Sequence, residues 1–179
     1  MGMKLYIGTG DGEIDPYHYK WIDDTWTKVD KFIEGPGIVK MDAVNLEFDD
    51  DSIEAIYASH LVEHIPHPDV PKMFSNWHRV LQSSGWAHIN VPDMEWIAEH
   101  ITKLCAGDTS GMTHYKTVDE LINKVIYGTQ HHPGEVHHSG YTSVTLHDAL
   151  QRAGFVDIGV ERVVEAHEIG CLVVDCYKP

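Results

Sequence analysis

The residues best suited to chemistry begin with three glycines, Gly8, Gly10 and Gly12, directly after an apolar run at Lys4–Ile7. Glycine tolerates positive φ and, without a Cβ, lets a ligand lie close against the backbone. A glycine turn at the end of a buried strand is typical of nucleotide-like sites in open α/β sheets. The dinucleotide fingerprint requires a further glycine where this chain has Glu13, so the spacing argues against a dinucleotide.

Polar residues also follow the next three predicted strands. They are Asp23 and Asp24, then Asp42 with Ala43, then Ser59 with His60. Carboxylates on adjacent strand ends can accept hydrogen bonds from ribose hydroxyls or from an exocyclic amine. Each aspartate alone would be an ordinary solvated strand end or helix cap. Their joint position behind a glycine turn favours a ligand site.

A histidine-rich segment, 131–138, contains four histidines and one glutamate. Such side chains can bind Zn²⁺ or a similar metal. They lie on a Pro-Gly turn rather than at helical i, i+4 spacing, and no cysteine is near them. We therefore expect no metal here. The alternatives are a solvated polar lid and, as we favour, a loop that contacts the second substrate, with His138 as its candidate catalytic residue.

These residues must be positioned by alternating strands and helices. Runs rich in β-branched and aromatic residues predict strands at Lys4–Ile7, Tyr19–Ile22, Ile38–Met41, Ile53–Ala58, Trp86–Val91, Val156–Val160 and Leu172–Tyr177. Apolar spacing predicts helices over 70–81 and 94–104, and Thr117 and Thr145 resemble helix-capping residues. This alternation predicts a mostly parallel sheet in a single domain, 1–179, with 93–142 as a lid or substrate wall. The eight residues between Gly12 and Trp21 leave room for one helical turn at most.

Composition narrows the class of partner. Thirteen Lys and Arg against 28 Asp and Glu give a net charge of −15, which argues against nucleic acid and against an anionic membrane surface. The three cysteines are sparse and odd in number, which favours a reducing, cytoplasmic compartment. No apolar stretch approaches the length of a membrane span.

Several short motifs follow one another along the chain: Gly8-Thr9-Gly10, Ser59-His60-Leu61-Val62-Glu63-His64, Arg79-Val80-Leu81, Val91-Pro92-Asp93 and Leu150-Gln151-Arg152-Ala153-Gly154-Phe155. Taken in order, they resemble the class I S-adenosylmethionine-dependent methyltransferases, and in particular a small family with a G-C-G turn and an S-H-x-x-E-H motif. Each motif alone is weak, whereas the ordered set spans nearly the whole chain.

The resemblance implies a Rossmann-like three-layer sandwich, whose seven-stranded, mostly parallel sheet has an antiparallel last strand. It implies S-adenosylmethionine as the cofactor, with the turn at 8–10 near its amino-acid part and Asp23, or else Asp24, on the ribose. Asp42 and Ala43 would flank the adenine, and Ser59 and His60 the methyl group. The chain departs from the family in having Thr9 for cysteine, Ser83-Ser84 for Pro-Gly and no helix before the first strand.

Methyl transfer requires a base only when the acceptor carries a proton of high pKa, and His60 is the first candidate, followed by His138. Glu63 and His64 are a further acid–base pair, or residues that only cap and pack. We expect an enzyme acting on a small-molecule or glycan-type acceptor. Open alternatives are a degenerate cofactor-binding or scaffold module, an NAD-dependent oxidoreductase and a metal-dependent hydrolase; a homodimer is also open.

Overall fold

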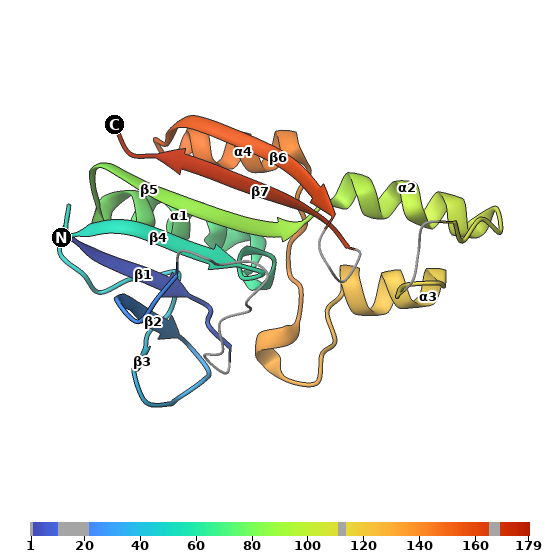
Figure 1. Ribbon diagram of the computed structural model, residues 1–179, viewed down its shortest axis with the longest axis horizontal. Helices are drawn as coiled ribbons and strands as arrows, with labels where there is room; N and C mark the ends of the chain where they lie inside the picture. The colour runs from blue at the N-terminus through green and yellow to red at the C-terminus, as the bar shows by residue number, and fades with distance from the viewer. Residues whose placement is uncertain (1, 11–21, 111–113, 165–168) are drawn as a thin grey trace.

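The computed structural model describes residues 2–10, 22–110, 114–164 and 169–179. Seven strands form one sheet in the order β3-β2-β1-β4-β5-β7-β6 (Figure 1). The strands are β1 (Met3–Ile7), β2 (Trp26–Asp30), β3 (Ile38–Lys40), β4 (Ile53–Ser59), β5 (Leu81–Pro92), β6 (Val156–Val164) and β7 (Gly170–Tyr177). Strand β7 is antiparallel to both β5 and β6, and the pairs from β3 to β5 are parallel. This topology confirms the predicted sheet and its antiparallel last strand.

Helices α1 (Val70–Val80) and α4 (Ser143–Arg152) lie together on one face of the sheet (Figure 1). The apolar positions of α1, among them Phe74 and Trp77, are buried in the hydrophobic core, where α1 contacts β5 and α4, as their helical spacing predicts. The N-cap of α4 is Thr142, which forms a capping box with Thr145. The predicted cap therefore lies three residues too late.

Beyond the carboxyl ends of β4 and β5 lie α2 (Met94–Cys105) and α3 (Val118–Glu120), which continues into a π-helical turn, η3 (Leu121–Ile126) (Figure 1). Thr117 caps α3 by accepting a hydrogen bond of 3.1 Å from the Glu120 N–H, as predicted. Three single 3₁₀ turns complete the described elements: η1 (Val62–His64), η2 (His67–Asp69) and η4 (Pro133–Glu135).

The second strand is the main correction to the sequence prediction. Of the predicted run Tyr19–Ile22, residues 19–21 lie outside the described part of the chain, as does the whole connection from Gly12 to Trp21. Ile22 is described and is not in a strand. Strand β2 is Trp26–Asp30. Its sequence, with Thr27 and Lys28 half-buried, lacks a continuous apolar run because β2 lies next to the short edge strand β3.

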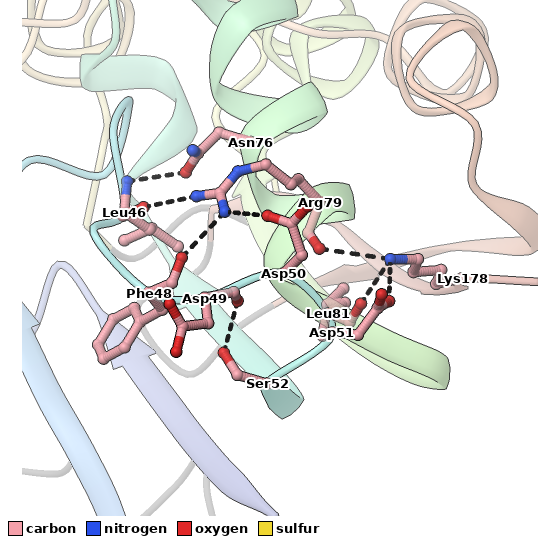
Figure 2. A network of polar contacts seen from close by, with 10 residues as sticks. All are labelled: Leu46, Phe48, Asp49, Asp50, Asp51, Ser52, Asn76, Arg79, Leu81 and Lys178. Carbon is pink, nitrogen blue, oxygen red and sulfur yellow. Dashed lines mark hydrogen bonds and ion pairs between the residues drawn. The ribbon is translucent and has the colours of Figure 1, made fainter.

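A polar network fixes the segment between β3 and β4, which contains no helix (Figure 2). Arg79 of α1 donates to the carbonyls of Leu46 and Phe48, each at 2.9 Å, and to the Asp50 carboxylate at 2.6 Å. Lys178 joins Asp51 to the Leu81 carbonyl. The same segment is held nearer the sheet by the Trp77 indole N–H, which donates to the Ala43 carbonyl at 2.9 Å. The residues that follow β3 are therefore held in place by α1.

Candidate functional site

A cavity of about 680 Å³ opens at the carboxyl ends of β1 to β4. Six of the predicted site residues line it: Gly8, Gly10, Asp42, Ala43, His60 and His138. Thr9 and Ser59 do not line it, although both adjoin residues that do. Asp23 and Asp24 precede β2 and therefore lie at the opposite edge of the sheet, where both are exposed.

The glycine turn has the geometry that its sequence predicts. Gly8 has a φ of +74°, and a Cβ there would lie 2.9 Å from Cδ1 of Leu61. Gly10 has a φ of +56°, and a Cβ there would meet no atom of the described residues within 4 Å. Both positions require a left-handed backbone, which favours glycine. The turn thus presents backbone without a Cβ to the cavity that Gly8 and Gly10 line.

Asp30 is the site residue that the sequence reasoning missed. It ends β2 and lines the cavity, and its Oδ2 atom accepts a hydrogen bond of 3.1 Å from the Gly10 N–H. Its Oδ1 atom accepts from the N–H groups of Phe32 and Ile33 at 2.8 and 2.9 Å. Correct placement of β2 would have revealed it, because Asp30 is the carboxylate that directly follows the buried Val29.

Asp23, in contrast, caps a turn. Its Oδ1 atom accepts hydrogen bonds from the N–H and hydroxyl of Thr25 at 2.9 and 2.5 Å, and these bonds lower the pKa of Asp23. An exposed carboxylate in a local turn has the solvated role that was the alternative prediction for it.

Asp42 occupies the corresponding position after β3. It forms an ion pair of 2.8 Å with Lys31 and accepts from the Val44 N–H at 2.9 Å. Burial raises the pKa of Asp42, but these two contacts outweigh burial and lower the pKa below its ordinary value. The side chain is thus an ionised acceptor on the cavity wall. Next to it, the Phe32 ring is 47% exposed in the cavity and meets the His132 ring edge-on at 5.2 Å.

His60 follows β4 with a φ of +47°, a left-handed conformation that is uncommon outside glycine. Its N–H donates to the Asn90 carbonyl at 2.9 Å, and its Nδ1 atom lies 3.2 Å from Oε1 of Glu63. The Cys171 sulfur lies 4.0 Å from Nε2. A strained backbone and a buried carboxylate together fix the direction of the imidazole ring.

The histidine-rich segment folds back onto η1. The N–H groups of His138 and Ser139 both donate to the Glu63 carbonyl, at 2.7 and 3.1 Å, and the Ser139 hydroxyl donates to the Val62 carbonyl. Residues 132–135 and His138 line the cavity, whereas His131 and His137 do not. These contacts place part of the long excursion beside the strand ends.

Glu63 lies at the centre of a small polar cluster that is buried behind the cavity. Its side chain is 1% exposed, and its Oε2 atom has no hydrogen-bond partner among the described residues. Ligand atoms of Glu63, His64 and His137 lie within 4.8 Å of one another. Burial raises the pKa of Glu63, but the hydrogen bond from His60 and the nearby histidines lower it below its ordinary value. Burial likewise lowers the pKa of His137, which favours the neutral ring.

Comparison with known proteins agrees with this geometry. The family model for a methyltransferase domain matches residues 7–89, the segment from the end of β1 into β5. A search of curated proteins finds no match. Among solved structures, a methyltransferase of Thermotoga maritima, a possible histamine N-methyltransferase, has a TM-score of 0.61 at 14% identity, covering 100% of this chain and 83% of its own.

Two further structures contain bound ligands. The 1,6-didemethyltoxoflavin-N1-methyltransferase of Burkholderia thailandensis, with bound 1,6-didemethyltoxoflavin and S-adenosylhomocysteine, has a TM-score of 0.63 at 15% identity. The match covers 99% of this chain and 71% of that protein. Phosphoethanolamine N-methyltransferase 2 of Haemonchus contortus, with phosphomonomethylethanolamine and S-adenosylhomocysteine, has a TM-score of 0.60 at 12% identity. The likeness covers 99% of this chain but only 49% of that protein. At these identities the structures establish the fold.

The sheet order and the cavity at its carboxyl edge define a Rossmann-like α/β protein of the class I methyltransferase fold. Together with the family match, they identify the chain as an S-adenosylmethionine-dependent methyltransferase whose cofactor is S-adenosylmethionine. None of the helices in the described ranges has the length and apolar character needed to cross a membrane.

Proposed function

We propose that this methyltransferase acts on a small-molecule or glycan-type acceptor, in the cavity at the carboxyl ends of β1 to β4. One observation carries the proposal. A single cavity joins the glycine turn and two carboxylates, Asp30 and Asp42, to two histidines, His60 and His138. Candidate cofactor-binding groups and candidate acid–base groups thus share one cavity, which is of the size typical of small-molecule sites.

The residues of the cavity fit S-adenosylmethionine. Gly8 and Gly10 line the cavity without a Cβ, so the amino-acid part of the cofactor could lie close against their backbone. Asp30 replaces Asp23 as the acceptor for the ribose hydroxyls, since it is the carboxylate that ends β2. Asp42 is placed to accept from the adenine amine, with Ala43 beside it, and the exposed ring of Phe32 offers a stacking face.

The bound cofactor supplies a methyl group already activated by its sulfonium, so the main task of the chain is alignment. Holding nucleophile, methyl and sulfur in line contributes about 7 kcal/mol or more. His60, oriented by Glu63, is placed to accept a proton from an acceptor hydroxyl. His138, which belongs to the histidine-rich segment 131–138, also lines the cavity and is the second candidate base.

The acceptor class rests on the size of the cavity and on the charge of the chain. The Burkholderia and Haemonchus proteins bind small molecules, 1,6-didemethyltoxoflavin and phosphomonomethylethanolamine. In this chain, residues 132–135 narrow the cavity from the side of Phe32. A net charge of −15 opposes a polyanionic acceptor.

Calorimetric titration with S-adenosylhomocysteine, with NADH as the control ligand, tests the cofactor site. Saturable micromolar binding of S-adenosylhomocysteine alone is expected. Formation of S-adenosylhomocysteine from S-adenosylmethionine is then followed with pools of hydroxylated and amine-bearing small molecules and of oligosaccharides. Binding without turnover on any pool would contradict the acceptor class and favour the cofactor-binding module.

A further inference from the structure

Glu63, His64 and His137 bring a carboxylate and two imidazoles together from two segments far apart in the sequence. Glu63 and His64 belong to η1, and His137 belongs to the loop that folds back onto it. Their ligand atoms lie within 4.8 Å of one another, close enough for one ion to contact all three. We propose that these residues bind a divalent transition-metal ion of the Zn²⁺ type.

Both imidazoles are already oriented as metal-binding histidines usually are. Nδ1 of His64 lies 3.2 Å from the Val136 carbonyl, and Nδ1 of His137 lies 2.8 Å from the Val125 carbonyl. A carbonyl oxygen can only accept, so in each neutral ring Nδ1 is the donor and Nε2 carries the lone pair. Metal-bound histidines typically donate their second N–H to a backbone carbonyl in this way.

The carboxylate supplies the independent observation. Glu63 is 1% exposed; its Oε1 atom faces His60 at 3.2 Å, and its Oε2 atom has no partner among the described residues. A buried carboxylate oxygen without a partner is costly, and an ion pairs it directly. Among the described residues, no hydrogen-bond donor compensates for the burial of this oxygen.

The donor set selects the class of metal. Two imidazole nitrogens and one carboxylate are a common zinc set, with one coordination position left for water or substrate, whereas Ca²⁺ and Mg²⁺ prefer all-oxygen sites. His64 lines the cavity, so the ion would lie beside it. An ion here would tie the loop at 137 to η1 and so hold the cavity wall in place.

This site differs from the metal site that the run of histidines suggested. Of the loop histidines, only His137 belongs to it, and the exposed His131 lies outside both the cluster and the cavity. The proposal does not depend on the methyl-transfer function, because it rests on the geometry of the three ligands.

The test uses the full chain without an affinity tag, stripped with chelator and then titrated with Zn²⁺ by calorimetry. Co²⁺ provides a second probe, because its visible absorption reports the coordination geometry. We expect one ion per chain and a Co²⁺ spectrum of low-coordinate N/O ligation. His137→Gln should weaken binding about 100-fold or more, because removing a ligand should cost at least as much as removing a group that only orients one. His131→Gln, the control from the same loop, should bind as the wild type does.

Glu63→Gln could fail to fold, so it is not used as the test. The number of ions bound by the wild type and the affinity of His137→Gln decide the proposal. Circular dichroism checks that the variant is folded. Absence of Zn²⁺ and Co²⁺ binding in the wild type would overturn the proposal. Equal affinity in folded His137→Gln would also overturn it. So would loss of binding in His131→Gln, which would indicate adventitious binding by the exposed loop histidines.

Discussion

The carboxylate of Asp30 accepts a hydrogen bond of 3.1 Å from the main-chain N–H of Gly10, so the end of β2 holds the glycine turn that follows β1. The same carboxylate caps the N–H groups of Phe32 and Ile33. Asp30 therefore holds both the glycine turn and the backbone at Phe32 and Ile33, and it also lines the cavity itself.

The first prediction concerns this carboxylate. Asp30→Asn keeps the side-chain shape but removes the charge, and should weaken S-adenosylhomocysteine binding by about 1.5–3 kcal/mol, the contribution of hydrogen bonds to a charged group. Calorimetric titration measures the change. Asp23→Asn is the matched control and should leave the affinity unchanged, because Asp23 is exposed before β2. Unchanged affinity in Asp30→Asn together with weakened affinity in Asp23→Asn would instead make Asp23 the residue that binds the ribose.

A second prediction separates binding from catalysis at His60. His60→Gln retains a polar side chain but cannot act as a base near neutral pH. We expect kcat to fall at least about 100-fold for a hydroxyl acceptor, in line with the usual contribution of general bases. The affinity for S-adenosylhomocysteine should change far less. A large loss of affinity with unchanged kcat would make His60 a cofactor-binding residue only.

The third prediction tests the polar network around Arg79 (Figure 2). Arg79→Met leaves the carbonyls of Leu46 and Phe48 without their donor, which should lower the free energy of unfolding by about 1–3 kcal/mol. Urea denaturation provides the measurement. Arg152→Met is the control, since its 3.9 Å pair with Asp148 is highly exposed, and the change should stay within about 0.5 kcal/mol. Equal effects in the two variants would show that the network does not stabilise the fold.

The fourth prediction is a pH dependence of stability that arises from His78. Burial lowers the pKa of His78 below its ordinary value of 6.5, and nearby Lys178 lowers it further. The unfolded chain therefore takes up this proton first. Stability from this group is fully present above the unfolded pKa and is lost as the pH falls through about 6.5 towards the lower folded value.

Wild type should accordingly lose more free energy of unfolding than His78→Gln between about pH 7.5 and about pH 5.5, because Gln does not titrate. Urea denaturation at the two pH values measures the difference. Parallel losses in both proteins would mean that the pKa of His78 is the same in the folded and unfolded chain.

Much of the fold could be predicted from local sequence pattern. Strand β4 is apolar almost throughout because it is covered on both faces, and α1 repeats its apolar residues at helical spacing because only one side meets the sheet. The glycine turn could likewise be predicted, because the positive φ values at Gly8 and Gly10 favour glycine over other residue types. The order of the motifs also indicated the class of enzyme and its cofactor.

Strand β2 could not be located in this way, so Asp23 and Asp24, which precede β2, were expected at the end of a strand. A strand beside a short edge strand is partly solvated, so Trp26–Asp30 carries polar residues that hide its pattern. An apolar run earlier in the chain was the stronger local signal. The ribose carboxylate that we propose, Asp30, became visible only when parallel pairing placed the end of β2 beside Gly8.

The sequence alone thus indicated the class of protein and its cofactor, through the resemblance that the ordered motifs carry. It also indicated the cavity residues Gly8, Gly10, Asp42 and His60, because glycine turns and strand ends follow from local rules of backbone conformation and burial. Only the tertiary structure decided which carboxylate faces the cavity. It also joined His137 to Glu63 and His64, which no spacing within the loop could reveal. Contacts between distant segments depend on how the chain packs, and local residue pattern does not encode them.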